Sequence, residues 1–133
     1  MTAKPKINII GTGGTIAGRA ASATDLAYDA AQLSVDELLE DIPGLKDIAD
    51  ISATNLFALN SKDMGPGEWL KLARRVETCA EDQDTAGVVV THGTDTLEEA
   101  ALFLELTLRT QKPVVITGSM RAATALSADG PAN

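Results

Sequence analysis

The chain has 133 residues, which is enough for one domain with a substantial core, so we take residues 1–133 as a single domain. Hydrophobic residues make up 44% of the chain but aromatic residues only 3%, and we therefore expect an aliphatic core like that of a helix-covered parallel sheet. The net charge of -8 argues against nucleic acid or an anionic membrane as partner, and one cysteine with one histidine argues against an internal disulfide and a Cys/His metal site.

The N-terminus carries no apolar signal-peptide segment, because Met1 leads directly into polar residues and Pro5. Nor does any apolar run reach the length of a membrane span. We therefore predict a cytoplasmic protein. A periplasmic location is the alternative if a signal peptide was removed before this numbering begins.

The first predicted element is a buried strand at residues 6–10 (KINII), which opens into the glycine-rich residues 11–18 (GTGGTIAG). Glycines there allow positive φ angles and close backbone approach, and they leave Thr12 and Thr15 as the functional side chains. A phosphate cradle fits poorly, because the spacing matches neither the dinucleotide nor the P-loop motif. Covalent chemistry by a threonine and a plain turn remain as interpretations.

Residues 19–32 show no periodicity and are long for a connection, which is typical of a functional lid or a disordered loop. Tyr28, the only tyrosine, lies within this segment and could be a packing or surface aromatic. Ser34 and Glu37 then form a capping-box pattern, which predicts a short helix to about residue 42.

Residues 48–59 are predicted to form a strand pair, or a strand and an extended segment, interrupted near Thr54. Ser61 follows in the loop at the strand end, where a helix-capping role is the alternative to a functional one. A helix is predicted to begin near Gly65. Its expected core positions are Trp69, Leu72, Ala73, Val76, Cys79 and Ala80. Its expected solvated positions are Lys71, Arg74, Arg75 and Glu77.

Residues 86–90 (AGVVV) form a continuous apolar run, which predicts a strand buried on both faces. It ends in residues 92–96 (HGTDT), and a helix follows at once. That helix is apolar on two faces, the second of which carries Leu102, Phe103 and Leu106. We therefore expect it to meet a further element or a partner subunit.

The last predicted strand is residues 114–117 (VVIT), expected to be buried and followed by the loop 118–121 (GSMR). Residues 127–131 (SADGP) then carry the signals of a helix start. The sequence ends shortly afterwards, which suggests that the chain is a fragment of a longer protein.

The repeated order of strand, loop and helix predicts an α/β fold: a doubly wound, mainly parallel sheet with helices on both faces. Such sheets bind ligands at the carboxyl ends of their strands. The loops expected there are residues 11–18, 60–63, 92–96 and 118–121. Their candidate functional side chains are Thr15, Ser61, Thr94, Asp95 and Ser119.

Acyl transfer is the chemistry that fits these side chains, because a threonine can attack a carbonyl if a base and N–H donors assist it. Asp95 could orient such a base or bind a substrate ammonium group, and capping the following helix is an equally good interpretation. His92 could be a general base, although a histidine that supports the loop is the simpler interpretation.

Two motifs, residues 12–18 (TGGTIAG) and 91–96 (THGTDT), in this order and at this separation, resemble the two signatures of bacterial-type L-asparaginases. The likeness continues through residues 118–121 and 127–131, so it covers nearly the whole chain. The resemblance implies hydrolysis of L-asparagine, and often of L-glutamine more slowly, through an acyl-enzyme. It also implies that no metal or organic cofactor is used.

The resemblance assigns roles by position. Thr15 matches the nucleophile and Tyr28 the tyrosine that helps to activate it. Thr94 and Asp95 match the second catalytic group, in which the aspartate also holds the substrate's α-amino group. Ser61 matches the serine that binds the α-carboxylate. Ser119 stands, with Ala122, where the family commonly has Ala and Pro, and a backbone contact to substrate is expected there.

The resemblance further implies that the family's catalytic lysine lies beyond Asn133, together with a smaller C-terminal domain that shapes an intimate dimer within a homotetramer. We therefore expect the isolated 133-residue chain to be inactive. A glutaminase-asparaginase and a non-catalytic amino-acid-binding module are the alternative functions.

Overall fold

The computed structural model describes residues 3–25, 27–40 and 42–133. In chain order the strands and helices are β1 (Lys6–Gly13), β2 (Arg19–Ala20), β3 (Tyr28–Asp29), α1 (Val35–Glu40), α2 (Leu45–Ile48), β4 (Asp50–Leu59), α3 (Pro66–Glu81), β5 (Thr85–Thr91), α4 (Leu97–Thr107) and β6 (Val114–Thr117). Short 3₁₀ turns occupy Thr15–Ala17, Ser61–Asp63, Thr94–Thr96 and Gly130–Ala132. Within these described ranges, no helix has the length and apolar character needed to cross a membrane.

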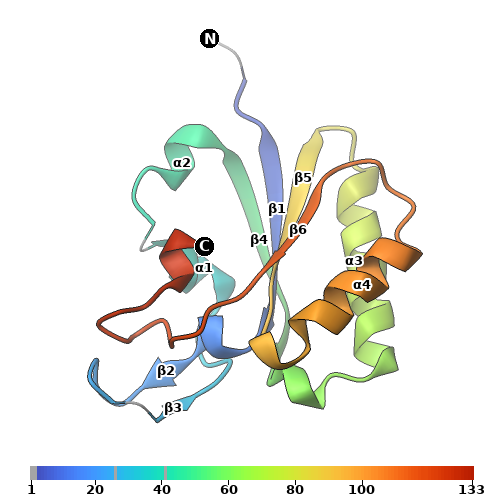
Figure 1. Cartoon of the computed structure of the whole chain (residues 1–133). Coiled ribbons are helices and arrows are strands. Elements are labelled where there is room, and N and C mark those ends of the chain that lie inside the picture. Colours follow the sequence, from blue (N-terminus) through green and yellow to red (C-terminus); the bar gives the residue numbers. More distant parts are fainter. Residues whose placement is uncertain (1–2, 26, 41) are drawn as a thin grey trace.

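Four strands form one parallel sheet in the order β4-β1-β5-β6, and β2 pairs with β3 in a separate antiparallel hairpin. Helices α3 and α4 cover one face of the parallel sheet, while α1 lies on the other side (Figure 1). This confirms the predicted α/β architecture with helices on both faces. Because all four strands run the same way, their carboxyl ends meet at one edge, the lower edge in Figure 1.

The main core lies between the sheet and α3. Its buried members are Ile10, Leu72, Ala73, Val76, Cys79, Val88, Val90 and Leu104. The continuous apolar run of β5 is explained by its central place between β1 and β6, where side chains of both faces are covered. Trp69 is only half-buried and packs against Phe103, with ring centroids 5.7 Å apart. The predicted stripe of α3 is therefore confirmed except at its first residue.

The predicted capping box at α1 is confirmed. The Ser34 backbone N–H and hydroxyl both donate to Glu37 Oε2 at 2.8 Å, and the Glu37 N–H donates back to Ser34 Oγ at 3.2 Å. These hydrogen bonds lower the pKa of Glu37 below its ordinary value. The capping box satisfies the N–H groups of Ser34 and Glu37. The Val35 N–H donates instead to Asn55 Oδ1 at 2.8 Å.

Two connections differ from the sequence prediction. Residues 48–59 are not a strand pair, because Asp50–Leu59 is a single strand, and the irregularity near Thr54 appears instead as a register shift in the pairing with β1 beyond Asn55. Residues 19–32 are not a featureless loop, because β2 and β3 pair within them. Two-residue strands are too short to show periodicity in a sequence.

The last predicted strand is only partly buried. Val115 in β6 is 54% exposed, because β6 has a strand on one side only among the described residues. On α4 the second apolar face is exposed as well, with Leu102 at 60% and Leu106 at 75%. The predicted second apolar face is confirmed at Leu102 and Leu106. It is wrong at Phe103, which packs against the main core. What covers the second face stays a prediction.

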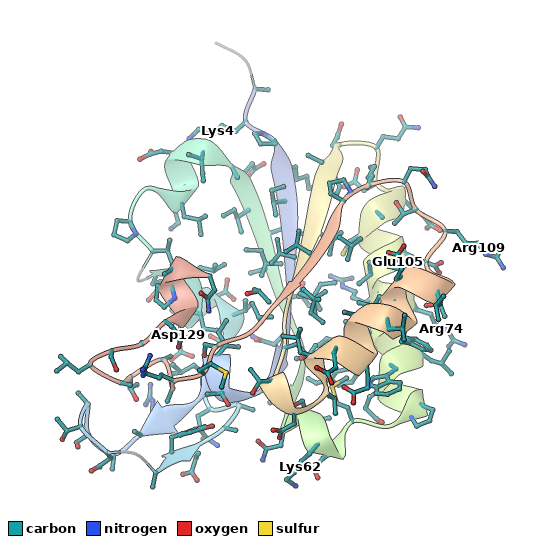
Figure 2. The ribbon with its side chains drawn as sticks, in the orientation of Figure 1. Lys4, Lys62, Arg74, Glu105, Arg109 and Asp129 are labelled. Atoms are coloured by element: carbon teal, nitrogen blue, oxygen red, sulfur yellow. The ribbon has the colours of Figure 1, made fainter. Side chains whose placement is uncertain are left out.

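The charged residues Arg74 of α3, Glu105 of α4 and Arg109, in the segment after α4, lie on the outer side of this helical layer and point away from the sheet (Figure 2). Arg75 is a correction to the predicted solvated face. It is half-buried and donates from its guanidinium to Thr54 Oγ1 in β4 at 3.0 Å. A long side chain can reach across the helix edge in this way while its stem covers apolar surface.

Candidate active site

The loops after the four parallel strands lie together at the carboxyl edge of the sheet, as predicted. The β2–β3 hairpin and the start of α4 also lie at this edge (Figure 1). Lys62, in the turn after β4, projects from the same edge (Figure 2). Hydroxyl and carboxylate side chains from separate parts of the sequence are thereby gathered in one region.

Thr15 and Tyr28 form a hydroxyl pair across the glycine loop and the hairpin. Thr15 Oγ1 and Tyr28 Oη are 2.8 Å apart, and either hydroxyl could donate. Tyr28 is placed by pairing with Ala20, and its ring lies against Gly18, where a Cβ would come within 2.8 Å of it. Tyr28 is 40% exposed. The phenol is therefore a specific partner of Thr15 and not only a surface aromatic.

Gly14 brings the glycine loop into direct backbone contact with the turn after β5. Its φ is +78°, and a Cβ built on it would lie 2.3 Å from Gly93 Cα. Its N–H donates to the Leu59 carbonyl at the end of β4, at 2.9 Å. Only a glycine fits here, because both the left-handed conformation and the close approach exclude a side chain. The loop that holds Thr15 is thus fixed against both neighbouring strand ends.

Ser61 is buried beside this contact. It is 3% exposed, and its Oγ would lie 2.5 Å from a Cβ placed on Gly93. Ser61 is the first residue of a 3₁₀ turn whose N-cap is Asn60, and its hydroxyl does not cap that turn. The helix-capping interpretation of Ser61 is therefore wrong, which leaves its hydroxyl for another role.

Thr94 and Asp95 form the exposed start of the 3₁₀ turn that precedes α4. Within the described part of the chain, the Asp95 carboxylate has no hydrogen bond, and the N-terminus of α4 has no side-chain cap. The pKa of Lys62 is raised chiefly by its hydrogen bond to Asp63, with a smaller contribution from the Asp95 charge. Asp95 therefore lies near the turn after β4, and helix capping does not explain it.

Ser119 lies in the loop after β6 and is 2% exposed. Its hydroxyl donates to the Arg121 carbonyl at 2.8 Å, so it is occupied within its own loop. Gly118 brings this loop close to the turn after β5, because a Cβ there would lie 2.6 Å from the His92 carbonyl oxygen. The loop thus adjoins the site, while the Ser119 side chain points into its own backbone.

Asp129 holds the same loop from the far end of the chain. Its two carboxylate oxygens accept the Met120 and Arg121 N–H groups, each at 2.9 Å. The Met120 hydrogen bond is the largest cause that lowers the pKa of Asp129, and burial opposes it. At the predicted helix start, residues 127–131, a 3₁₀ turn begins at Gly130 with Pro131 in its first turn. The Asp129 carboxylate does not cap this turn and clamps the loop after β6 instead.

The Asp129 clamp is expected to open in acid. Because the folded pKa of Asp129 lies below its unfolded value, the clamp contributes stability above the unfolded pKa and loses it as pH falls through the folded one, below about pH 4. Hydrogen exchange of the Met120 and Arg121 amides, corrected for intrinsic rates, should accelerate in that range. Asp129→Asn should accelerate the same exchange already at pH 7. Equal protection in the variant at pH 7 would contradict the clamp.

His92 is buried next to the candidate site and is not exposed at its surface. It is fully buried, with Nδ1 2.7 Å from Thr12 Oγ1 and Nε2 3.2 Å from Thr96 Oγ1. Burial lowers the pKa of His92, and a weaker backbone contribution from Thr96 opposes this. Both ring nitrogens are therefore engaged with threonines, which favours the loop-supporting role over that of general base.

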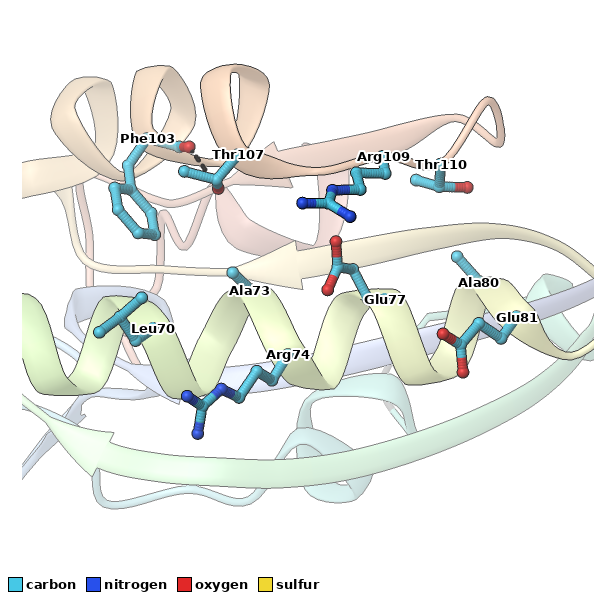
Figure 3. Close-up of a pocket in the computed structure, with 10 residues that line it drawn as sticks. All are labelled: Leu70, Ala73, Arg74, Glu77, Ala80, Glu81, Phe103, Thr107, Arg109 and Thr110. Atoms are coloured by element: carbon cyan, nitrogen blue, oxygen red, sulfur yellow. Dashed lines mark hydrogen bonds between the residues drawn. The ribbon is translucent and has the colours of Figure 1, made fainter.

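The groove between α3 and α4 is a separate feature (Figure 3). It measures about 710 Å³ and carries side chains of both charges, including Arg74, Glu77 and Arg109. In Figure 3 the Arg109 and Glu77 side chains point toward one another. No group at the carboxyl edge lines this groove, so it is not part of the candidate site.

Among the described residues, the assembled site offers hydroxyl groups and the Asp95 carboxylate, which has no hydrogen bond there. Such groups suit acyl transfer, in which an activated hydroxyl attacks a carbonyl carbon. In the ranges that the structure describes, no group of three His, Cys, Asp or Glu side chains could hold a metal ion.

Residues 6–133 match the family model described as Asparaginase, N-terminal. The chain belongs to the asparaginase family. It is 50% identical over 129 residues to a probable periplasmic L-asparaginase of Haemophilus influenzae. The matched region covers 97% of this chain and 36% of that protein. It is 47% identical over 131 residues to L-asparaginase 2 of Escherichia coli (98% and 37%) and to a glutaminase-asparaginase of Acinetobacter glutaminasificans (98% and 40%).

Among solved structures, a probable cytoplasmic L-asparaginase from Campylobacter jejuni matches this asparaginase-family chain with a TM-score of 0.93 and 45% identity. The match covers 98% of this chain and 40% of that one. The chain thus spans little more than a third of the length of the relatives that it matches.

Two residues that support this asparaginase-family site, Gly93 and Thr96, were assigned no role from the sequence. Thr12 was noted as a hydroxyl in the glycine loop, but it is 1% exposed and bonds inward to His92. Gly93 is needed where the Gly14 backbone and Ser61 press against it. Strand alternation offers a signal for Thr12, because it follows the buried Ile10 by two residues and so shares its face.

Proposed function

We propose that this chain is the N-terminal part of an amidohydrolase that converts L-asparagine to L-aspartate and ammonia, as the names of its relatives indicate for them. The observation that carries the proposal is the Thr15–Tyr28 hydroxyl pair, 2.8 Å apart, at the carboxyl edge of the parallel sheet. A threonine hydroxyl is a weak nucleophile at its ordinary pKa, so an adjacent proton acceptor is what such a reaction needs.

In the proposed reaction, Thr15 Oγ1 attacks the side-chain amide carbon of the substrate. The Thr15 proton passes to the Tyr28 oxygen while the Tyr28 hydroxyl gives its own proton to the amide nitrogen. The tetrahedral intermediate then collapses, the C–N bond breaks, and the protonated nitrogen leaves as ammonia. Water hydrolyses the resulting ester: its oxygen forms the new bond to the carbonyl carbon, and one of its protons returns to Thr15 Oγ1 through Tyr28. This regenerates the Thr15 hydroxyl and releases L-aspartate.

The neighbouring polar groups are proposed to hold the two ends of the amino acid. Asp95 is an exposed carboxylate without a hydrogen bond among the described residues, and it would pair with the substrate α-ammonium group. Ser61 would donate to the α-carboxylate. Thr94 would act with Asp95 as the second catalytic group. At Ser119 the backbone would contact the substrate, because the side-chain hydroxyl is already bonded to the Arg121 carbonyl.

Several further properties are proposed for the complete protein. It would form a homotetramer, use no metal or organic cofactor, and act in the cytoplasm, with a periplasmic location as the alternative. Relatives with either location in their names are similar to this chain, which leaves both open. The isolated 133-residue chain is proposed to be inactive, because the family's lysine and second domain would lie outside it.

An ammonia-release assay tests the proposal. The complete gene product is expected to release ammonia from L-asparagine, while the isolated chain at the same concentration should release none. Comparing kcat/KM for L-asparagine and L-glutamine distinguishes an asparaginase from a glutaminase-asparaginase, the second candidate favoured by the relatives that carry that name. Ammonia release by the isolated chain would overturn its proposed inactivity.

The non-catalytic binding module makes a different prediction for the same material. Calorimetry with L-aspartate would then show binding by the complete gene product although neither amide is turned over. That combination would contradict the proposed enzyme. Turnover together with L-aspartate binding supports it.

A further inference from the structure

The loop after β6, residues 118–121, is held in shape by side chains of residues 129 and 133. Asp129 Oδ2 accepts the Met120 N–H and Asp129 Oδ1 accepts the Arg121 N–H, each at 2.9 Å (Figure 2). The Asn133 side-chain amide donates to the carbonyl of the first residue of the loop at 2.9 Å. Two N–H groups and one carbonyl of this short loop are therefore fixed by partners outside it.

The Ser119 carbonyl has no hydrogen-bond partner among the described residues, although the Ser119 hydroxyl donates to the Arg121 carbonyl. Ser119 is 2% exposed, so water meets this oxygen over a small area at most. A buried carbonyl without a partner is rare in folded proteins, because it has lost its hydration and gained no hydrogen bond. An N–H donor of a bound substrate would satisfy it.

The planarity of the peptide group determines where this carbonyl points. In a trans peptide the C=O and the N–H point in opposite directions, and no cis peptide occurs in the described part of the chain. The Ser119 carbonyl shares its peptide group with the Met120 N–H, which points at Asp129. The carbonyl therefore points away from Asp129, and the bond to Asp129 sets its direction.

Ser119 lies close to both turns that carry the proposed catalytic groups. A Cβ on Gly130 would lie 3.1 Å from Ile16 Cγ1 and 3.7 Å from Ser119 Cβ, and Ile16 directly follows the proposed nucleophile. A Cβ on Gly118 would lie 3.4 Å from Thr94 Cγ2. The unpaired carbonyl is therefore next to the groups proposed to act on the substrate amide.

We propose that Asp129 is a positioning residue that orients the Ser119 carbonyl toward the side-chain amide of the substrate. The carbonyl accepts a hydrogen from the amide NH₂ group, which holds the scissile C–N bond beside Thr15. Asp129 touches no substrate and acts through the peptide group that joins Ser119 to Met120. The contact with the substrate rests on the proposed function, whereas the orientation of the peptide group does not.

The first test measures the hydrogen bonds themselves and needs no substrate. In the complete gene product at pH 7, the Met120 and Arg121 amides should exchange at least about 100-fold more slowly than in an unstructured peptide. Asp129→Asn replaces one acceptor oxygen by an NH₂ group, so the exchange of these amides should become about tenfold faster. Unprotected amides in the unchanged protein would overturn the orientation by Asp129, whether or not the variant folds and whether or not the protein hydrolyses amides.

The second test separates orientation of the carbonyl from a general loosening of the site. L-Aspartate β-methyl ester has the carbon skeleton of L-asparagine, but its leaving group has no N–H to donate to the Ser119 carbonyl. Asp129→Asn should therefore lower kcat/KM for L-asparagine about tenfold and change kcat/KM for the ester less than about threefold. An equal loss for both substrates would show that Asp129 only stabilises the fold, and would overturn the positioning role.

Asp84→Asn is the matched control. It removes the same charge from an exposed residue just before β5, at the amino end of the strand and so at the opposite edge of the sheet. Its kcat/KM should be unchanged for both substrates. If the complete gene product hydrolyses neither substrate, the proposed function fails, and the exchange measurement still decides the orientation. If it hydrolyses both and Asp129→Asn keeps the ratio of amide to ester hydrolysis, only the positioning role fails.

Discussion

Gly14→Ala is expected to destabilise the fold by about 2–5 kcal/mol and to abolish turnover, because the new methyl group has no room. A Cβ on Gly14 would lie 2.3 Å from Gly93 Cα and 2.5 Å from Gly93 N, and both are backbone atoms that cannot rotate away. The φ of +78° adds strain of about 1–2 kcal/mol for any residue with a Cβ. Overpacking of this kind costs a further 1–3 kcal/mol, roughly.

Two other glycines separate these costs. Gly44 has nearly the same φ, +76°, but a Cβ there would meet nothing within 4 Å, so Gly44→Ala should cost only the strain, about 1 kcal/mol. Gly67 lies in α3 with open space and no positive φ, so Gly67→Ala should stabilise by roughly 1 kcal/mol. Urea unfolding of the three variants measures the differences. A Gly14→Ala cost no larger than that of Gly44→Ala would show that the contact with Gly93 does not constrain the loop.

Much of the fold could be predicted because it depends on local patterns. The apolar run of β5 and the capping box of Ser34 and Glu37 are both complete within a few residues, and both are confirmed. The errors arose where distant partners decide the structure. The strand Asp50–Leu59 is held together by its pairing with β1, and the exposure of Val115 follows from the place of β6 in the sheet. Neither partner can be read from the local sequence.

The candidate site was also predictable only in part: the sequence predicts which loops meet, but not the contacts of their side chains. Parallel strands that end at one edge predict which loops converge, so the grouping of Thr15, Ser61 and Asp95 at one edge followed from topology. The sequence does not say which way a side chain turns at that edge. Residues 127–131 carry the signals of a helix start, and nothing in them predicts that the Asp129 carboxylate binds two amides of the loop after β6. Such contacts depend on how the loops fold over one another, which periodicity does not encode.

Thr15→Val is expected to lower kcat for L-asparagine in the complete gene product by at least about 10⁴-fold, as loss of a nucleophile does in other covalent enzymes. Valine has nearly the shape of threonine but no hydroxyl, and Thr15 is only half-buried, so the fold should persist. The melting temperature should stay within a few degrees, and the affinity for L-aspartate within about threefold. The loss would then be one of chemistry and not of folding or binding.

Three further variants test whether the missing Thr15 hydroxyl causes this loss of kcat. Thr15→Ser keeps a nucleophilic oxygen and should retain activity within about 10²-fold of the original. Tyr28→Phe removes only the hydroxyl that lies 2.8 Å from Thr15 Oγ1, and should lower kcat by about 10²- to 10³-fold, the range of a lost general base. Thr24→Val is the matched control, because Thr24 is exposed in the segment between β2 and β3 and its nearest hydroxyl partner is Ser22, at 3.3 Å. Its kcat should be unchanged.

If Thr15→Val kept full activity, the glycine loop would be a plain turn. The nucleophile would then have to be another hydroxyl at the carboxyl edge of the sheet, and Thr94 would be the first to replace.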